Sequence, residues 1–131
     1  MLVSGEWFKE INIDNFEIIE TMIRPITVKN RSYIGISDTN GDYIQIGGYA
    51  DRVNAEVRIY EAAEKFKHYK ADTSSNETPG FEIISIGGAS VKVSPTQVLT
   101  LETAINLVKS FYKGNKLSET VYWNDMTEMF A

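Results

Sequence analysis

A strictly alternating segment between Val53 and Tyr60 constrains the fold of this chain more than any other feature. Its apolar residues alternate one by one with polar or amphipathic ones; the first set is Val53, Ala55, Val57 and Ile59, and the second is Asn54, Glu56, Arg58 and Tyr60. Successive side chains of a strand point to opposite faces, so the pattern predicts a strand with one buried face and one wet face. Such strands are typical of antiparallel sheets.

Several further segments predict strands around this one. Asn40-Gly41 favours a hairpin turn over residues 38–42, because this pair readily adopts positive φ, and the turn would join strands over 31–37 and 43–47. Gly47-Gly48 permits a bulge or a bend. Residues 61–70 are compatible with a helix, but we favour a turn followed by a strand. Shorter strands are expected over 26–28, 81–86, 89–93 and 120–123, with a mobile loop over 71–80.

The first of two predicted helices covers residues 14–24. Asp14 can cap its first turn, and Glu17 follows three residues later as in a capping box. Ile13 and Ile18 occupy the positions of a hydrophobic staple around that cap. Pro25 ends the segment, because the residue before a proline is pushed out of the helical region.

The second predicted helix covers residues 101–113. Thr100 is its expected N-cap, and Gly114 stands where a helix commonly ends in a left-handed residue. Its apolar residues recur at helical spacing and form one stripe. A helix, a run of hairpin-linked strands and a second helix predict an α+β fold, in which two main helices pack on an antiparallel sheet of about five to seven strands. A length of 131 residues predicts a single domain over residues 1–131.

Composition excludes several kinds of function. The chain has no cysteine, which removes disulfides, thiol nucleophiles and zinc–thiolate sites. A formal net charge of −5 repels nucleic acid and anionic membranes, so neither is expected as a partner. No apolar run approaches the roughly 20 residues that a membrane helix needs, and the first residues do not resemble a secretory signal. We therefore expect a cytoplasmic protein.

The sequence shows no arrangement of residues typical of a catalytic, metal or cofactor site. His68 is the only histidine, and it lies in a lysine-rich stretch with no acid–base partner beside it in the sequence. We expect it to be an exposed residue without a role, and its replacement by alanine to leave function nearly intact. Glu56 and Arg58 share one strand face, where they could form a structural ion pair, contact a partner or carry a substrate. The chain is accordingly predicted not to be an enzyme and to need no cofactor.

Several short segments resemble one known family. They are the stretch 43–48 (YIQIGG), Glu56-Val57-Arg58, His68-Tyr69, the stretch 93–100 (VSPTQVLT), a helix with Ala104 and Phe111, Lys113-Gly114, and Tyr122-Trp123. Together they are similar to the immunity protein 1 family of bacterial polymorphic toxin systems, which include contact-dependent growth inhibition. The resemblance implies a small protein that binds and neutralises a cognate toxin domain.

Toxin domains of this kind are often nucleases or deaminases, and hence basic, so an acidic inhibitor would complement them. The expected toxin-binding residues lie in acidic loops, on the wet strand face and near the C-terminus: Asp38, Asp42, Asp51, Asp72, Glu77, Glu56, Arg58 and Trp123. Turn-forming preferences explain the loop aspartates equally well. Two other functions stay open. One is an enzyme or small-ligand carrier with a pocket between helix and curved sheet, and the other is a structural or adaptor module.

Overall fold

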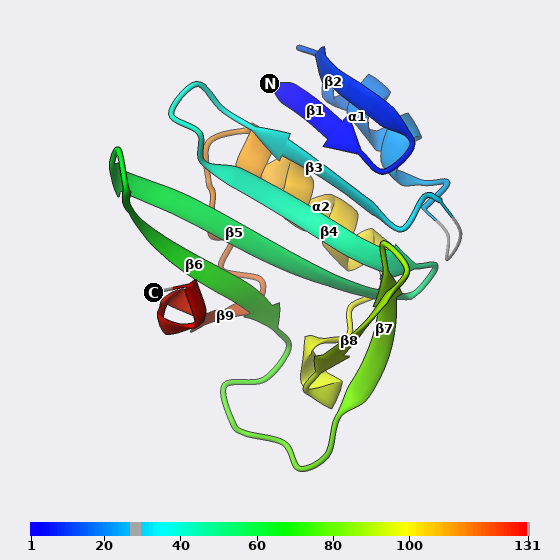
Figure 1. The fold of residues 1–131 in the computed structure, drawn as a ribbon, viewed down its shortest axis with the longest axis vertical. Helices are drawn as coiled ribbons and strands as arrows, with labels where there is room; N and C mark the ends of the chain where they lie inside the picture. Colours follow the sequence, from blue (N-terminus) through cyan, green and yellow to red (C-terminus); the bar gives the residue numbers. More distant parts are fainter. Residues whose placement is uncertain (27–29, 131) are drawn as a thin grey trace.

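A seven-stranded antiparallel sheet forms the body of the protein (Figure 1). The computed structural model describes residues 1–26 and 30–130. Across the sheet the strand order is β2-β1-β3-β4-β5-β6-β9. The strands are β1 (Leu2–Gly5), β2 (Phe8–Asn12), β3 (Tyr33–Ser37), β4 (Tyr43–Tyr49), β5 (Arg52–Ala62), β6 (Lys65–Asp72) and β9 (Tyr122–Asp125).

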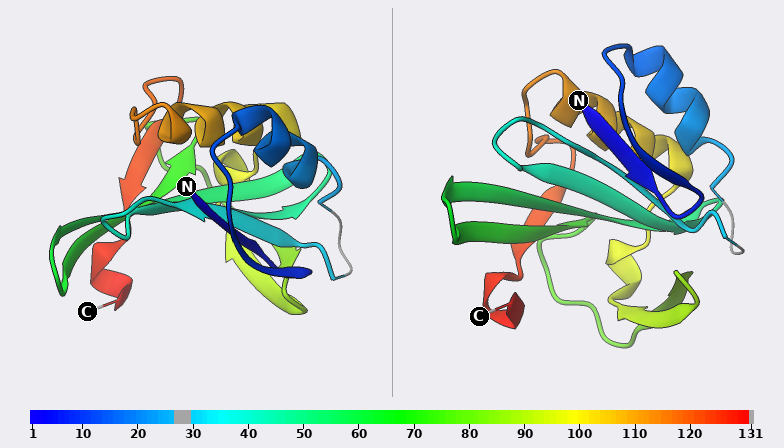
Figure 2. Two further views of the ribbon diagram at one scale, coloured as in Figure 1. Left: turned by 90° about the horizontal axis from the view of Figure 1, so that it is seen from above. Right: turned by 45° about the horizontal axis from the view of Figure 1, so that its top comes forward.

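Two helices cover one face of this sheet. Helix α1 (Phe16–Ile23) and helix α2 (Leu101–Tyr112) lie side by side on it (Figure 2). The core fills the space between helices and sheet, with side chains such as Ile19, Ile44, Val57 and Phe111 fully buried. The predicted α+β fold, an antiparallel sheet with two helices packed on it, is thereby confirmed. No helix among the described residues combines the length and apolar character needed to cross a membrane.

A two-stranded hairpin and two 3₁₀ helices lie on the opposite face or at its border. Strands β7 (Glu82–Ile86) and β8 (Ala89–Val93) form a separate hairpin below the sheet (Figure 2). The 3₁₀ helix η1 (Pro95–Gln97) follows β8, and η2 (Thr127–Phe130) follows β9. The hairpin and η2 leave the middle of this face between them, and that region holds the candidate site.

Most predicted elements are present, with altered ends. The Asn-Gly turn joins β3 to β4, residues 61–70 form a turn and a strand, and α2 begins after its predicted cap Thr100. Helix α1 is shorter than predicted. Its N-cap is Asn15, whose Oδ1 accepts a hydrogen bond from the Glu17 amide at 2.9 Å, while Asp14 binds the N-terminal ammonium instead. The capping box and staple predicted around Asp14 are therefore wrong by one residue.

Two features of the N-terminal half differ more strongly from the predictions. No strands were predicted before residue 14, yet β1 and β2 form a hairpin at one edge of the sheet, because short strands with only Val3 fully buried leave little alternation to detect. A strand was predicted over residues 26–28. Ile26 is not in a strand, and residues 27 and 28 lie outside the described part of the chain.

The alternation in β5 is confirmed on the helix-facing side, but one residue of the other side is buried. Val53, Ala55 and Val57 are inaccessible to solvent, as predicted. Asn54 is buried as well, because it pairs with Gly47, where the β7–β8 hairpin covers the sheet. A Cβ atom on Gly47 would lie 2.7 Å from Ile86 Cδ1, so the absence of a side chain there lets the hairpin approach.

Replacing Gly48 by alanine is expected to destabilise the protein by about 3 kcal/mol. Gly48 has a φ of 123°, and an added Cβ would collide with the carbonyl oxygen of Arg52, so backbone strain and overpacking add up. Gly88→Ala is the control: Gly88 also has a positive φ, 80°, but nothing lies within 4 Å of the new Cβ, and the expected cost is about 1 kcal/mol. Urea unfolding measures both; equal costs would contradict the packing described here.

Candidate functional site

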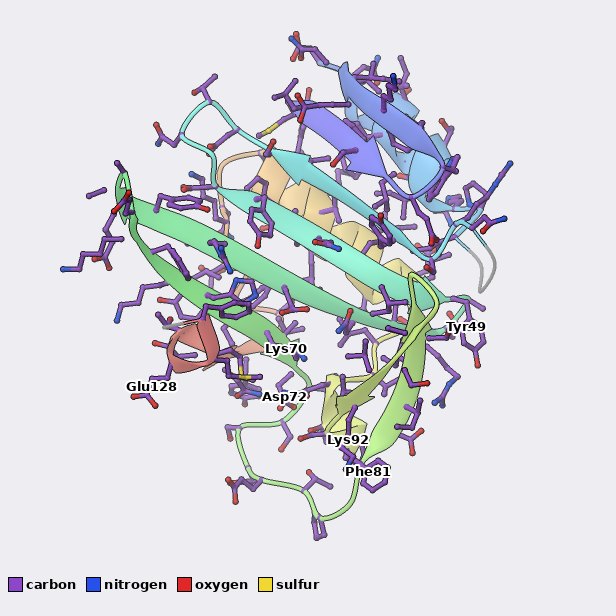
Figure 3. All side chains as sticks on the ribbon, viewed as in Figure 1. Tyr49, Lys70, Asp72, Phe81, Lys92 and Glu128 are labelled. Carbon is purple, nitrogen blue, oxygen red and sulfur yellow. The ribbon has the colours of Figure 1, made fainter. Side chains whose placement is uncertain are left out.

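Polar side chains from β5 and β6 meet on the sheet face away from the helices. Glu56 lies directly opposite Lys70 across the two strands, and Arg58 lies opposite His68. Directly opposed residues of an antiparallel pair share one face and touch. Figure 3 shows Lys70 between the β7–β8 hairpin and η2. We call Glu56, Arg58, His68 and Lys70 the polar row.

His68 is the centre of the polar row and is only 3% exposed. Arg58 Nε donates a hydrogen bond to His68 Nδ1 at 3.1 Å, so the ring hydrogen sits on Nε2, which donates to Glu56 Oε1 at 2.8 Å. The Phe130 ring lies 4.4 Å from the histidine ring, and the Thr127 hydroxyl accepts from the His68 amide at 3.0 Å. The prediction of an exposed histidine without a partner is wrong: Glu56 is that partner, and η2 buries the ring.

Aromatic rings enclose the guanidinium of Arg58. Its central carbon lies 3.9 Å from the ring centre of Phe66, 4.7 Å from that of Phe130 and 5.6 Å from that of Tyr43. A guanidinium over an aromatic face is attracted by the negative charge of the ring face. Glu56 and Arg58 form no direct ion pair with each other; His68 bridges the two residues instead.

The surroundings of Glu56 favour its charged form. Burial raises the pKa of this carboxyl. The hydrogen bond from His68 and the positive charges of Lys70 and Arg58 lower the pKa, and together they outweigh burial, so the pKa lies below its ordinary value of 4.5. A carboxylate with a lowered pKa stabilises the fold above its ordinary pKa, and this stabilisation is lost as the pH falls through the folded-state pKa. The contribution of the Glu56 carboxylate to stability is therefore fully present above the ordinary pKa of 4.5.

Most of the predicted acidic loop residues bond to other parts of the molecule. Lys116 forms ion pairs with both Asp38 and Asp42. Asp42 is also buried and accepts the Tyr60 amide at 2.7 Å, while Asp51 accepts the first amide of α2, from Leu101, at 3.1 Å. These three carboxylates thus stabilise turns and a helix end, which is the alternative that their turn positions left open.

The remaining predicted interface residues differ in exposure. Asp72 ends β6 and does not lie in the loop as predicted; it is buried and accepts from the Ser74 amide and the Asn124 side chain at 2.9 and 2.8 Å. Trp123 packs against the core and donates to the Ser118 carbonyl at 3.0 Å. Glu77 is exposed in the loop over residues 73–81.

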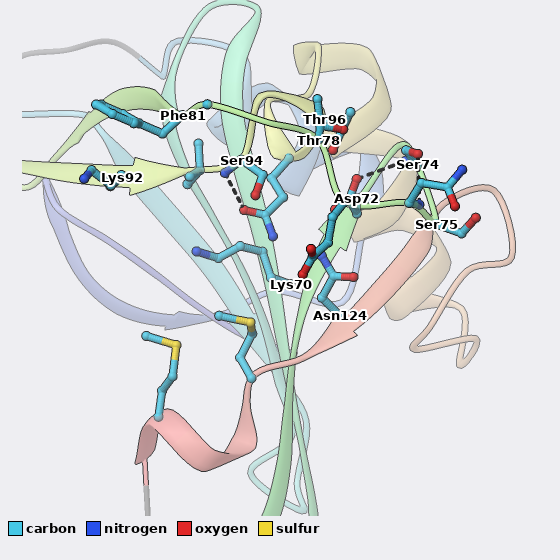
Figure 4. Close-up of a pocket in the computed structure, with 17 residues that line it drawn as sticks. Lys70, Asp72, Ser74, Ser75, Thr78, Phe81, Lys92, Ser94, Thr96 and Asn124 are labelled. Atoms are coloured by element: carbon cyan, nitrogen blue, oxygen red, sulfur yellow. Dashed lines mark hydrogen bonds between the residues drawn. The ribbon is translucent and has the colours of Figure 1, made fainter.

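A groove of about 510 Å³ opens beside the polar row (Figure 4). It is bounded by β6, the loop 73–81, β8 and the C-terminal segment, and its charged lining residues are Lys70, Asp72, Glu77 and Lys92. Two apolar side chains on its border are strongly exposed, Phe81 at 54% and Met129 at 73%. Lys70 was not among the predicted site residues, although it lies two positions after His68 and therefore on the same strand face.

Comparisons with known proteins add no assignment. No family model matches the sequence, and no curated protein matches it.

The hydrogen bond between Glu56 and His68 is expected to contribute about 1.5–3 kcal/mol of coupling energy at neutral pH, because one partner is charged and both are largely buried. A double-mutant cycle of Glu56→Ala and His68→Ala, followed by urea unfolding of each variant, measures it, because neither alanine can make the bond. The coupling is expected to shrink as the pH falls below 4.5, since the carboxylate then gains a proton. Additive mutations at neutral pH, or a coupling that does not change with pH, would show that the two residues act independently.

Proposed function

We propose that this domain is an immunity protein, which binds and neutralises a cognate toxin domain through the sheet face opposite the helices. The observation that carries the proposal is the groove on that face, with Phe81 and Met129 exposed on its border. Exposed apolar side chains next to polar ones are common in protein interfaces, where a few apolar anchors that become buried on binding supply most of the binding energy.

The architecture supports this choice of face. The helix-facing side of the sheet is filled by the core, while the opposite face offers an open groove and the loop 73–81. Loops carried on a rigid sheet commonly provide recognition residues. Of the acidic residues first considered, Glu77 lies in this loop and is exposed, so it can attract a basic toxin domain.

Catalysis is the less favoured alternative. Both ring nitrogens of His68 are engaged, by Arg58 and Glu56, and Phe130 stacks near the ring. A general base needs a nitrogen within reach of its substrate. Small-ligand binding has an observation of its own in its favour, because the volume of the groove lies within the range of ligand sites. That groove lies on the open sheet face, and not between helix and sheet as first expected.

Co-expression with a toxin domain encoded beside this chain's gene tests the proposal. We expect the wild-type protein to restore growth, and the double variant Phe81→Ala/Met129→Ala to bind the purified toxin domain at least about tenfold more weakly, because two exposed apolar anchors are lost. The matched control is Ile11→Ala/Ile18→Ala, which removes two comparably exposed apolar side chains from β2 and α1.

Growth that is not restored would contradict the proposed function. Restored growth with a control variant that binds as weakly as the groove variant would place the interface elsewhere on the molecule.

A further inference from the structure

Lys70 is a buried cation without a partner. Its side chain lines the groove and is only 8% exposed, yet among residues 1–26 and 30–130 no carboxylate forms an ion pair with its ammonium and no group accepts a hydrogen bond from it. Glu56 lies directly across the sheet and its charge interacts with that of Lys70, but the two groups form no direct ion pair, and Glu56 Oε1 accepts from His68. Figure 4 shows the ammonium end extending into the groove, away from Asp72 and Asn124.

Such a group is costly for the fold. An ammonium withdrawn from water loses much of its hydration, and this loss is normally compensated by a paired anion. Its position at a groove means that an anion arriving from solvent can provide the compensation. Because a bound anion would offset the lost hydration of the Lys70 ammonium, the free energy of binding would be more favourable.

The other charged groups of the groove leave this position open to an anion. Both oxygens of Asp72 already accept hydrogen bonds, and Figure 4 shows the Lys70 side chain pointing away from Asp72. Glu77 is exposed in the loop, whereas the ammonium of Lys92 lies 4.1 Å from the ring centre of Phe81. The hydroxyl of Thr96 is buried in the groove wall beside Asp72 without a well-formed hydrogen bond to a described group.

We propose that the groove binds a small organic acid, with its carboxylate on the ammonium of Lys70 and its apolar body against Met126, Met129 and Phe81. All four residues line the same groove, whose volume of about 510 Å³ suits a small molecule. The charge of the ligand replaces the missing partner of Lys70, and the thioether and aromatic side chains accept the apolar part. This site goes beyond the proposed immunity function and needs no toxin partner.

Three probes test the two parts of the proposed ligand. Hexanoate carries a carboxylate and an apolar body, hexanamide has the same body without charge, and acetate has the charge without the body. Each is titrated into the isotopically labelled protein while NMR follows the side-chain signals of Lys70 and the amides of residues 73–81. We expect saturable shifts with hexanoate, and at least about tenfold weaker binding of both other probes.

Variants on one strand complete the test. Lys70→Gln is expected to weaken hexanoate binding by at least about tenfold. Lys67→Gln, an equal change of charge at an exposed position of β6 outside this groove, is expected to leave it within about twofold. Lys70→Met, which removes the unpaired charge but keeps the length, is expected to raise the Tm and abolish hexanoate binding.

Three outcomes would overturn the site: no saturable shift with hexanoate, equal binding of hexanoate and hexanamide, or undiminished binding by Lys70→Met. None of them depends on toxin binding, so the failure of this site and the failure of the immunity function are distinguishable.

Discussion

The structure depends on the packing of short elements against the sheet face opposite the two helices. Helices α1 and α2 cover one face, and among the described residues the β7–β8 hairpin, η1 and η2 cover parts of the opposite face. Between these elements, His68 forms hydrogen bonds with Glu56 and Arg58 of β5. It also contacts η2, because its amide donates to Thr127 and its ring packs against Phe130. Because a buried polar side chain is stable only when its hydrogen bonds are made, this bonding fixes the packing of the C-terminal turn.

The groove is a consequence of that incomplete cover. The hairpin reaches the sheet at Gly47, and η2 reaches it at His68, so the surface between them stays open to solvent. Lys70 is the next residue of the polar row and faces this opening, where no carboxylate among the described residues forms a direct ion pair with it. The exposed apolar side chains of Phe81 and Met129 and the cation of Lys70 therefore both result from the uncovered surface between the β7–β8 hairpin and η2. The first favours a protein partner, and the second favours a carboxylate.

Local patterns predicted the fold better than the site. The alternation of β5, the Asn-Gly turn and the Thr100 cap act between near neighbours, and each is present in the structure. The burial of His68 depends on Phe130, and the neutralisation of Asp38 and Asp42 depends on Lys116; these partners lie far away in the sequence and are brought near by the fold. The position of Lys70 on the same strand face as His68 could have been predicted, because residues two apart on a strand share a face.

The central claim is that the protein acts through the sheet face opposite its helices. Amide hydrogen exchange of the free protein and of its complex with the toxin domain tests it most directly, because amides covered by a partner exchange more slowly. The account predicts slower exchange in the loop 73–81, in β8 and in residues 126–130, with little change in α1 and β2. Protection confined to α1 and β2, with the groove unchanged, would contradict it.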